Sequence, residues 1–219
     1  MTTQAGKTAG WRKTAMQATV GAIAGAGGMS VGLTLAEGQG GVDWAPSSII
    51  LFGVGFIFAL MGLFVGLGTA APNLVGRRLL NVADAEEIVE ERSSMGASSA
   101  CCLVLGAALM LLAYSVAAGA AASVSPAAAY WILLVVLGGF TAVSLWMWQS
   151  FDELWRQLTV EISAITGNVL MLVAIVWGGA AAAGLTAGPQ PLDLVSLAFG
   201  SMLLACFVAA GRRGMMAPR

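Results

Sequence analysis

The sequence predicts an all-α, polytopic integral membrane protein, with residues 1–219 forming a single bundle of six transmembrane helices in three hairpins. The chain is 58% hydrophobic and 10% charged, with a mean hydropathy of +0.87, whereas soluble domains carry about 25% charged residues. The apolar residues gather in runs long enough to cross a bilayer, which takes about 20 residues in a helix. The basic residues fall only in every second gap between these runs.

Six apolar runs are the predicted membrane spans. They lie at residues 14–36, 47–70, 97–121, 127–149, 162–185 and 192–210. The first is rich in Gly and Ala, and Lys7, Arg12 and Lys13 precede it, so a cleaved signal peptide is an alternative for this run. Its length and the poor cleavage pattern at Thr34 favour a retained helix.

The distribution of basic residues predicts the orientation of the bundle. All ten lie before the first run, after the second, after the fourth or after the sixth: Lys7, Arg12, Lys13, Arg77, Arg78, Arg92, Arg156, Arg212, Arg213 and Arg219. The other three gaps contain no Lys or Arg. The charged residues in or beside them are acidic: Glu37, Asp43, and Asp193 at the start of the sixth run. Because Lys and Arg are retained on the cytoplasmic side, we expect both termini in the cytoplasm. The Ala- and Gly-rich composition favours a bacterial inner (plasma) membrane.

The helices that return from the outer face share one start signal. Pro46, Pro126, and Pro189 with Pro191 precede or open the second, fourth and sixth runs. Proline fits the first turn of a helix, where its missing N–H is no loss. We therefore expect these three helices to begin at the outer turns.

The third and fifth helices begin before their apolar runs. Asp84 with Glu87, and Ser150 with Glu153, resemble capping boxes, so both helices are expected to extend into the cytoplasm. The similarity of the two segments leaves a duplicated hairpin as an alternative to coincidence. The acidic segment 76–94 is interpreted as a solvated helical extension, or as a docking surface for a basic partner.

Small residues recur along one face of the first helix and again along the second. The face consists of Thr14, Ala18, Gly21, Gly25, Gly28 and Gly32 on the first, and of Gly55, Ala59, Gly62 and Gly66 on the second. Spacings of 3 and 4 keep each set on one side of its helix. Association in lipid relies on close backbone contact, which small residues permit. We expect these glycines to bring helices unusually close, or to serve oligomerisation or sliding.

Polar residues share one face of the fifth helix. Glu153, Gln157, Glu161 and Asn168 follow helical spacing, and Asn168 lies about 10 Å deeper than Glu161 at 1.5 Å per residue. Together with Gln149 at the inner end of the fourth helix, they form a candidate polar path. Two interpretations remain open: hydrogen bonds between helices with Glu161 at the headgroups, or passage of a proton or small solute.

No catalytic, cofactor-binding or metal site is predicted. The chain has no histidine, so its Ser and Cys residues lack the usual base. Cys101, Cys102 and Cys206 lie in apolar runs without metal-ligand spacing. The net charge of −1 gives no reason to expect nucleic acid. An intramembrane enzyme is the least supported of the functions considered.

The predicted function is therefore a non-enzymatic one. We expect an inner-membrane protein that acts by helix–helix association, either as an accessory, assembly or scaffold subunit or as a self-oligomer. Its expected partners are the lipid bilayer and other membrane subunits or copies of itself. The alternative is a small-solute or proton transporter or channel, with its path along the fifth helix.

Overall fold

The computed structural model describes residues 30, 34, 42, 44–70, 92–148 and 153–213. Apart from Ser30 and Thr34, the first predicted span, 14–36, lies outside these residues. So do Gln149 and all of the segment 76–94 before Arg92. Within the described ranges the chain is helical and contains no strand.

Five helices are long and apolar enough to cross a membrane. They are α2 (Pro46–Ala70), α5 (Arg92–Ala118), α6 (Pro126–Met147), α7 (Glu153–Ala182) and α8 (Pro191–Arg212), and a short 3-10 turn, η2 (Gly119–Ala121), follows α5. These helices coincide with the last five predicted runs. They differ from the predicted bounds by a few residues, except that α5 and α7 begin earlier, as single helices that include the polar residues before each run.

The positions at which α2, α6 and α8 begin follow from local chemistry. Proline occupies the first turn of α2, α6 and α8, where no N–H is required. The hydroxyl of Ser125 accepts a hydrogen bond from the N–H of Ala128 at 3.2 Å, which caps α6. At α8 the carboxylate of Asp193 accepts a hydrogen bond from the N–H of Gln190 at 2.7 Å.

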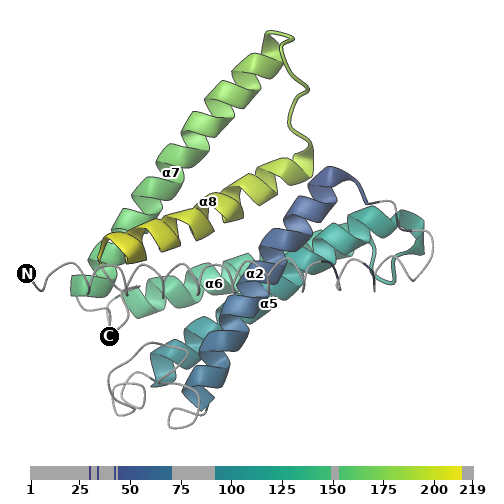
Figure 1. Cartoon of the computed structure of the whole chain (residues 1–219). Helices are drawn as coiled ribbons and strands as arrows, with labels where there is room; N and C mark the ends of the chain where they lie inside the picture. Colours follow the sequence, from purple (N-terminus) through teal and green to yellow (C-terminus); the bar gives the residue numbers. More distant parts are fainter. Residues whose placement is uncertain are drawn as a thin grey trace, which may run out of the picture.

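The packing of the helices is uneven (Figure 1). The most extensive contact joins α2 and α5, α6 packs on α5, and α8 packs on both α2 and α7. The buried core is formed by α2, α5, α6 and the side of α8 that packs on α2. Its larger side chains, together with Ala129, are Leu51, Phe58, Leu105, Leu109, Leu112, Leu133 and Leu203. This core therefore excludes α7.

Helix α7 stands apart from the rest of the described bundle. It forms a V with α8, and the two helices converge at the end where α7 begins (Figure 1). None of its most apolar stretch is buried (0%), compared with 39% for α5. With 30 residues it is about 45 Å long, whereas the hydrocarbon core is about 30 Å thick. Helix α7 is therefore longer than the hydrocarbon core is thick.

Candidate functional sites

Glycine backbones form the contact between α2 and α5. A Cβ atom built on Gly106 would lie 2.5 Å from both the amide nitrogen of Ala59 and the carbonyl oxygen of Gly55. A Cβ on Gly55 would lie 2.8 Å from the carbonyl oxygen of Gly106. These neighbours are backbone atoms, which cannot rotate away. The two helices can approach this closely only because both positions lack a side chain.

The same contact continues toward the end of α2. A Cβ on Gly62 would lie 2.7 Å from the carbonyl oxygen of Ser99, and one on Gly66 would lie 2.7 Å from the Ser99 hydroxyl. That hydroxyl donates a hydrogen bond to the carbonyl oxygen of Gly62 at 2.7 Å. Ser99 is 5% exposed, so this bond between helices is shielded from solvent and lipid.

In the structure, Gly55, Gly62 and Gly66 of α2 thus pack against α5. The glycines proposed for the first helix (Gly21, Gly25, Gly28 and Gly32) lie outside the described residues. The partners Ser99 and Gly106 were not singled out from the sequence. Their signal is a seven-residue spacing of small residues that continues to the fully buried Ala113.

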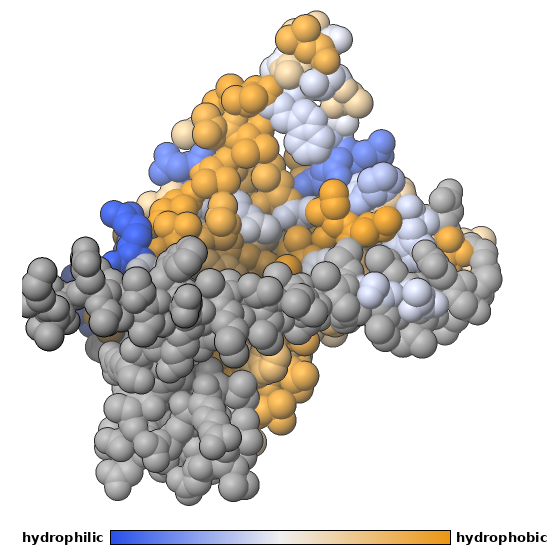
Figure 2. Space-filling model, in the orientation of Figure 1, coloured by the Kyte–Doolittle hydropathy of each residue, from blue (hydrophilic) through white to orange (hydrophobic). Residues whose placement is uncertain are grey.

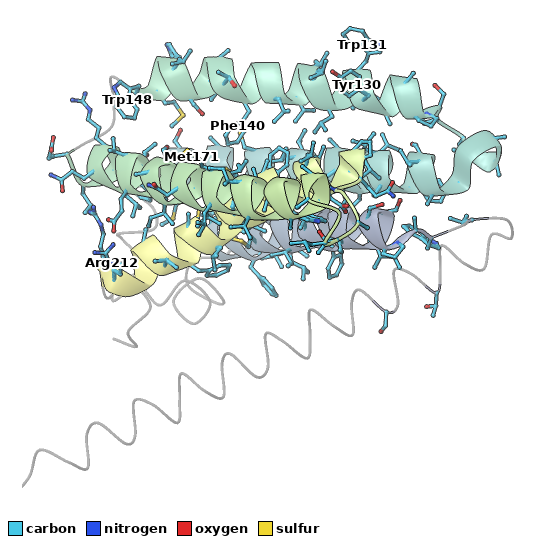
Figure 3. The ribbon with its side chains drawn as sticks, turned by 90° about the horizontal axis from the view of Figure 1, so that it is seen from above. Tyr130, Trp131, Phe140, Trp148, Met171 and Arg212 are labelled. Atoms are coloured by element: carbon cyan, nitrogen blue, oxygen red, sulfur yellow. The ribbon has the colours of Figure 1, made fainter. Side chains whose placement is uncertain are left out.

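An ion cluster joins the beginning of α7 to the end of α8. The carboxylate of Glu161 lies 3.0 Å from Nη2 of Arg213 and 3.2 Å from Nη1 of Arg212. Nε of Arg213 also donates to Glu161 at 3.1 Å. Figure 3 shows Arg212 at the end of α8, beside the start of α7. Two guanidinium groups thus share one carboxylate, and the cluster carries a net charge of +1.

Burial distinguishes the two arginines of this cluster. The side chains of Glu161 and Arg213 are 23% and 22% exposed, whereas that of Arg212 is 69% exposed. The pair of Glu161 and Arg213 therefore forms the shielded connection between the helices, and Arg212 remains largely in solvent. In the sequence, both arginines indicate only the expected orientation of the bundle. Their pairing with Glu161 could have been inferred, because adjacent helices joined by a short turn are antiparallel.

An open groove of about 480 Å³ lies beside the cluster. It is lined by Glu153, Arg156, Gln157, Val160, Glu161, Ala164 and Arg213. The amide of Gln157 donates to the carboxylate of Glu153 at 2.8 Å, within α7. The groove therefore combines two carboxylates and two guanidinium groups at the end of the bundle where α7 begins and α8 ends.

Asn168, the deepest residue of the candidate polar path, is not among the residues that line this groove. Its amide donates a hydrogen bond to the carbonyl oxygen of Ala164 in its own helix, at 2.8 Å. Gln149 lies outside the described residues. Of the four candidate path residues, the structure brings Glu161 and Gln157 into one groove and leaves Asn168 on an exposed side of α7.

A second groove, which the sequence did not predict, lies between α2, α7 and α8. It encloses about 360 Å³, and Trp177 and Asp193 are among its lining residues. The indole of Trp177 donates a hydrogen bond to the carbonyl oxygen of Ala187 at 3.0 Å, so it connects α7 to the turn between α7 and α8. Among the described residues, no three His, Cys, Asp or Glu side chains gather as a metal site would require.

Comparisons of the chain with protein-family models, with curated proteins and with solved structures found no match. Function is therefore inferred from the contacts and surfaces of this chain.

Proposed function

We propose that this chain is a non-enzymatic, multi-pass protein of the bacterial inner membrane that works by associating with other membrane helices. It would act as an accessory, assembly or scaffold subunit of a complex, or as a self-oligomer. The observation that carries this proposal is the contrast between α5, with 39% of its most apolar stretch buried, and α7, where the described residues bury none of that stretch. One part of the bundle is a tight core, and another presents a helix outward.

The proposed topology has six spans, with both termini in the cytoplasm and the lipid bilayer as the surrounding partner. It is supported by the placement of basic residues that are far apart in the sequence. Arg156 and Arg213 line the same groove, and Arg212 binds the same carboxylate as Arg213. Cations from two different gaps thus lie at one end of the bundle, as retention of positive charge on the cytoplasmic side requires.

The exposed side of α7 carries a polar residue, which supports a role for this side in contacts with other helices. A helix that faces lipid alone is best served by apolar side chains, since a polar group in hydrocarbon needs a hydrogen-bond partner. The exposed side of α7 carries Asn168 well inside the predicted span. Polar residues at such depth usually face other helices or water, which supports an association surface over a lipid-facing one.

The test is the composition of the particle in a native-like bilayer. We expect the full chain, extracted directly into lipid nanodiscs, to run as a defined oligomer or with a stoichiometric membrane partner, as measured by mass photometry and mass spectrometry. A monomer that brings no partner in nanodiscs of its native lipids would overturn the proposal.

A further inference from the structure

We propose that the exposed side of α7 is the contact surface between two copies of this chain, paired through the amide of Asn168. This inference rests on the proposed function and names the partner. We define the α7 face as a strip of exposed residues that begins at the groove beside Arg213 and runs along α7: Val160, Ala164, Gly167, Asn168, Met171 and Ile175. In Figure 2 the arm formed by α7 is covered by hydrophobic residues.

The α7 face is continuous, and none of the residues that the structure describes covers it. Val160, Ala164, Asn168, Met171 and Ile175 recur at spacings of 3 and 4, and Gly167 precedes Met171 by 4, so all six lie within about one third of the helix circumference. Val160 and Met171 are both 58% exposed, and Ile175 is 66% exposed. A Cβ built on Gly167 meets no atom within 4 Å. Small residues at Ala164 and Gly167 leave room for a second helix to approach closely, as at the α2–α5 contact.

The amide of Asn168 has unused hydrogen-bonding capacity. An asparagine side chain offers two N–H donors and a carbonyl oxygen. One N–H is used by the carbonyl oxygen of Ala164. For the rest of the amide, the described residues provide no further hydrogen bond. At about 10 Å beyond Glu161 the amide is inside the hydrocarbon, where water is not available to satisfy it. A partner must therefore supply a donor and an acceptor at that depth.

A second copy supplies both groups at the required depth. All copies insert with the same orientation, so a two-fold axis along the membrane normal places each residue of α7 level with its counterpart. The amide is self-complementary, because its free N–H can donate to the carbonyl oxygen of the other Asn168. At the inner end, Glu153 and Arg156 lie within one turn of each other, so two copies meet with both signs of charge rather than one.

The first arm of the experiment is disulfide crosslinking in liposomes of the full chain, in a background with Cys101, Cys102 and Cys206 replaced by Ala. Ile175→Cys lies on the α7 face, and Val176→Cys is its matched control. The two positions are 66% and 62% exposed and about 100° apart around the helix. We expect copper–phenanthroline oxidation to link Ile175→Cys and Gly167→Cys into dimers and to leave Val176→Cys monomeric.

The second arm keeps the native cysteines and measures the dimer dissociation constant in liposomes by subunit-capture photobleaching. Hydrogen bonds between membrane helices account for about a three- to thirty-fold change in affinity. We expect Asn168→Ala to weaken the dimer by that factor and Asn168→Gln, which retains the amide, to weaken it less. Thr166→Ala is the control, because its hydroxyl is already bound to the carbonyl oxygen of Ile162.

The outcomes separate this inference from the proposed function. An oligomer that is insensitive to Asn168→Ala and crosslinks equally at Ile175→Cys and Val176→Cys overturns the α7 contact and leaves association in place. A wild-type monomer that co-purifies with another membrane protein also overturns this inference alone. A monomer without any partner overturns both.

Discussion

At the scale of single residues, Gly106 is the described glycine at which an added Cβ would lie closest to a neighbouring helix. A Cβ atom at this position would lie 2.5 Å from two backbone atoms of α2. The substitution Gly106→Ala must therefore push α2 and α5 apart. We expect a loss of about 1–3 kcal/mol in unfolding free energy, as for other overpacked cores. Thermal unfolding in mild detergent, followed by tryptophan fluorescence, measures this loss.

The matched control for that substitution is Gly138→Ala on α6, where an added Cβ meets no atom within 4 Å. It should leave stability unchanged or raise it by up to about 1 kcal/mol through helix propensity. Equal destabilisation by the two substitutions would mean that glycine does not set the distance between α2 and α5.

Single residues also show where sequence reasoning ends. Gly55, Gly62 and Gly66 stand out because large apolar side chains surround them. Ser99 and Gly106 do not, because residues 96–108 contain small residues on every side of the helix. A pattern with small residues all round does not define a face. The seven-residue spacing of Ser99, Gly106 and Ala113 is therefore one of several such spacings on α5, and the three-dimensional packing identifies it as the contact.

At the scale of elements, the pair of Glu161 and Arg213 joins α7 to the rest of the described bundle. A double-mutant cycle with Glu161→Gln and Arg213→Gln should give a coupling energy of about 1 kcal/mol, at the upper end for partly exposed pairs. Unfolding in detergent at low salt provides the measurement, and added salt should reduce the coupling. The control is Glu153→Gln, since Glu153 binds Gln157 of its own helix. Additive effects of the two substitutions would contradict a connection through this pair.

The helix bounds were largely predictable, but the separation of α7 was not. Proline and capping residues mark where α2, α6 and α8 begin, and these are local signals. From Ile162 onward α7 is apolar on nearly all sides, so hydrophobic periodicity does not indicate which side meets α8. Its divergence from α8 depends on tertiary contacts, among them the ion cluster near the start of α7.

At the scale of the whole molecule, the proposed topology makes the ends of the bundle distinguishable. Reporter fusions after Ser150 and Arg213 should be active as cytoplasmic fluorescent proteins. Fusions after Val124 and Gly188 should instead be active as exported alkaline phosphatase, because the gaps there carry no Lys or Arg. Fusions after Ser150 and Arg213 that report opposite sides would refute the three-hairpin arrangement.

The ion cluster also has a consequence for biosynthesis. The chain is made from its N-terminus, and the two cations that neutralise Glu161 follow it by about fifty residues. In the proposed topology, Glu161 therefore reaches the membrane before Arg212 and Arg213 have been made. The ion cluster can form only after α8 has been made and lies beside α7. A chain halted before Arg212 would lack both ion pairs of this cluster, although Arg156 of α7 would still lie beside Glu161.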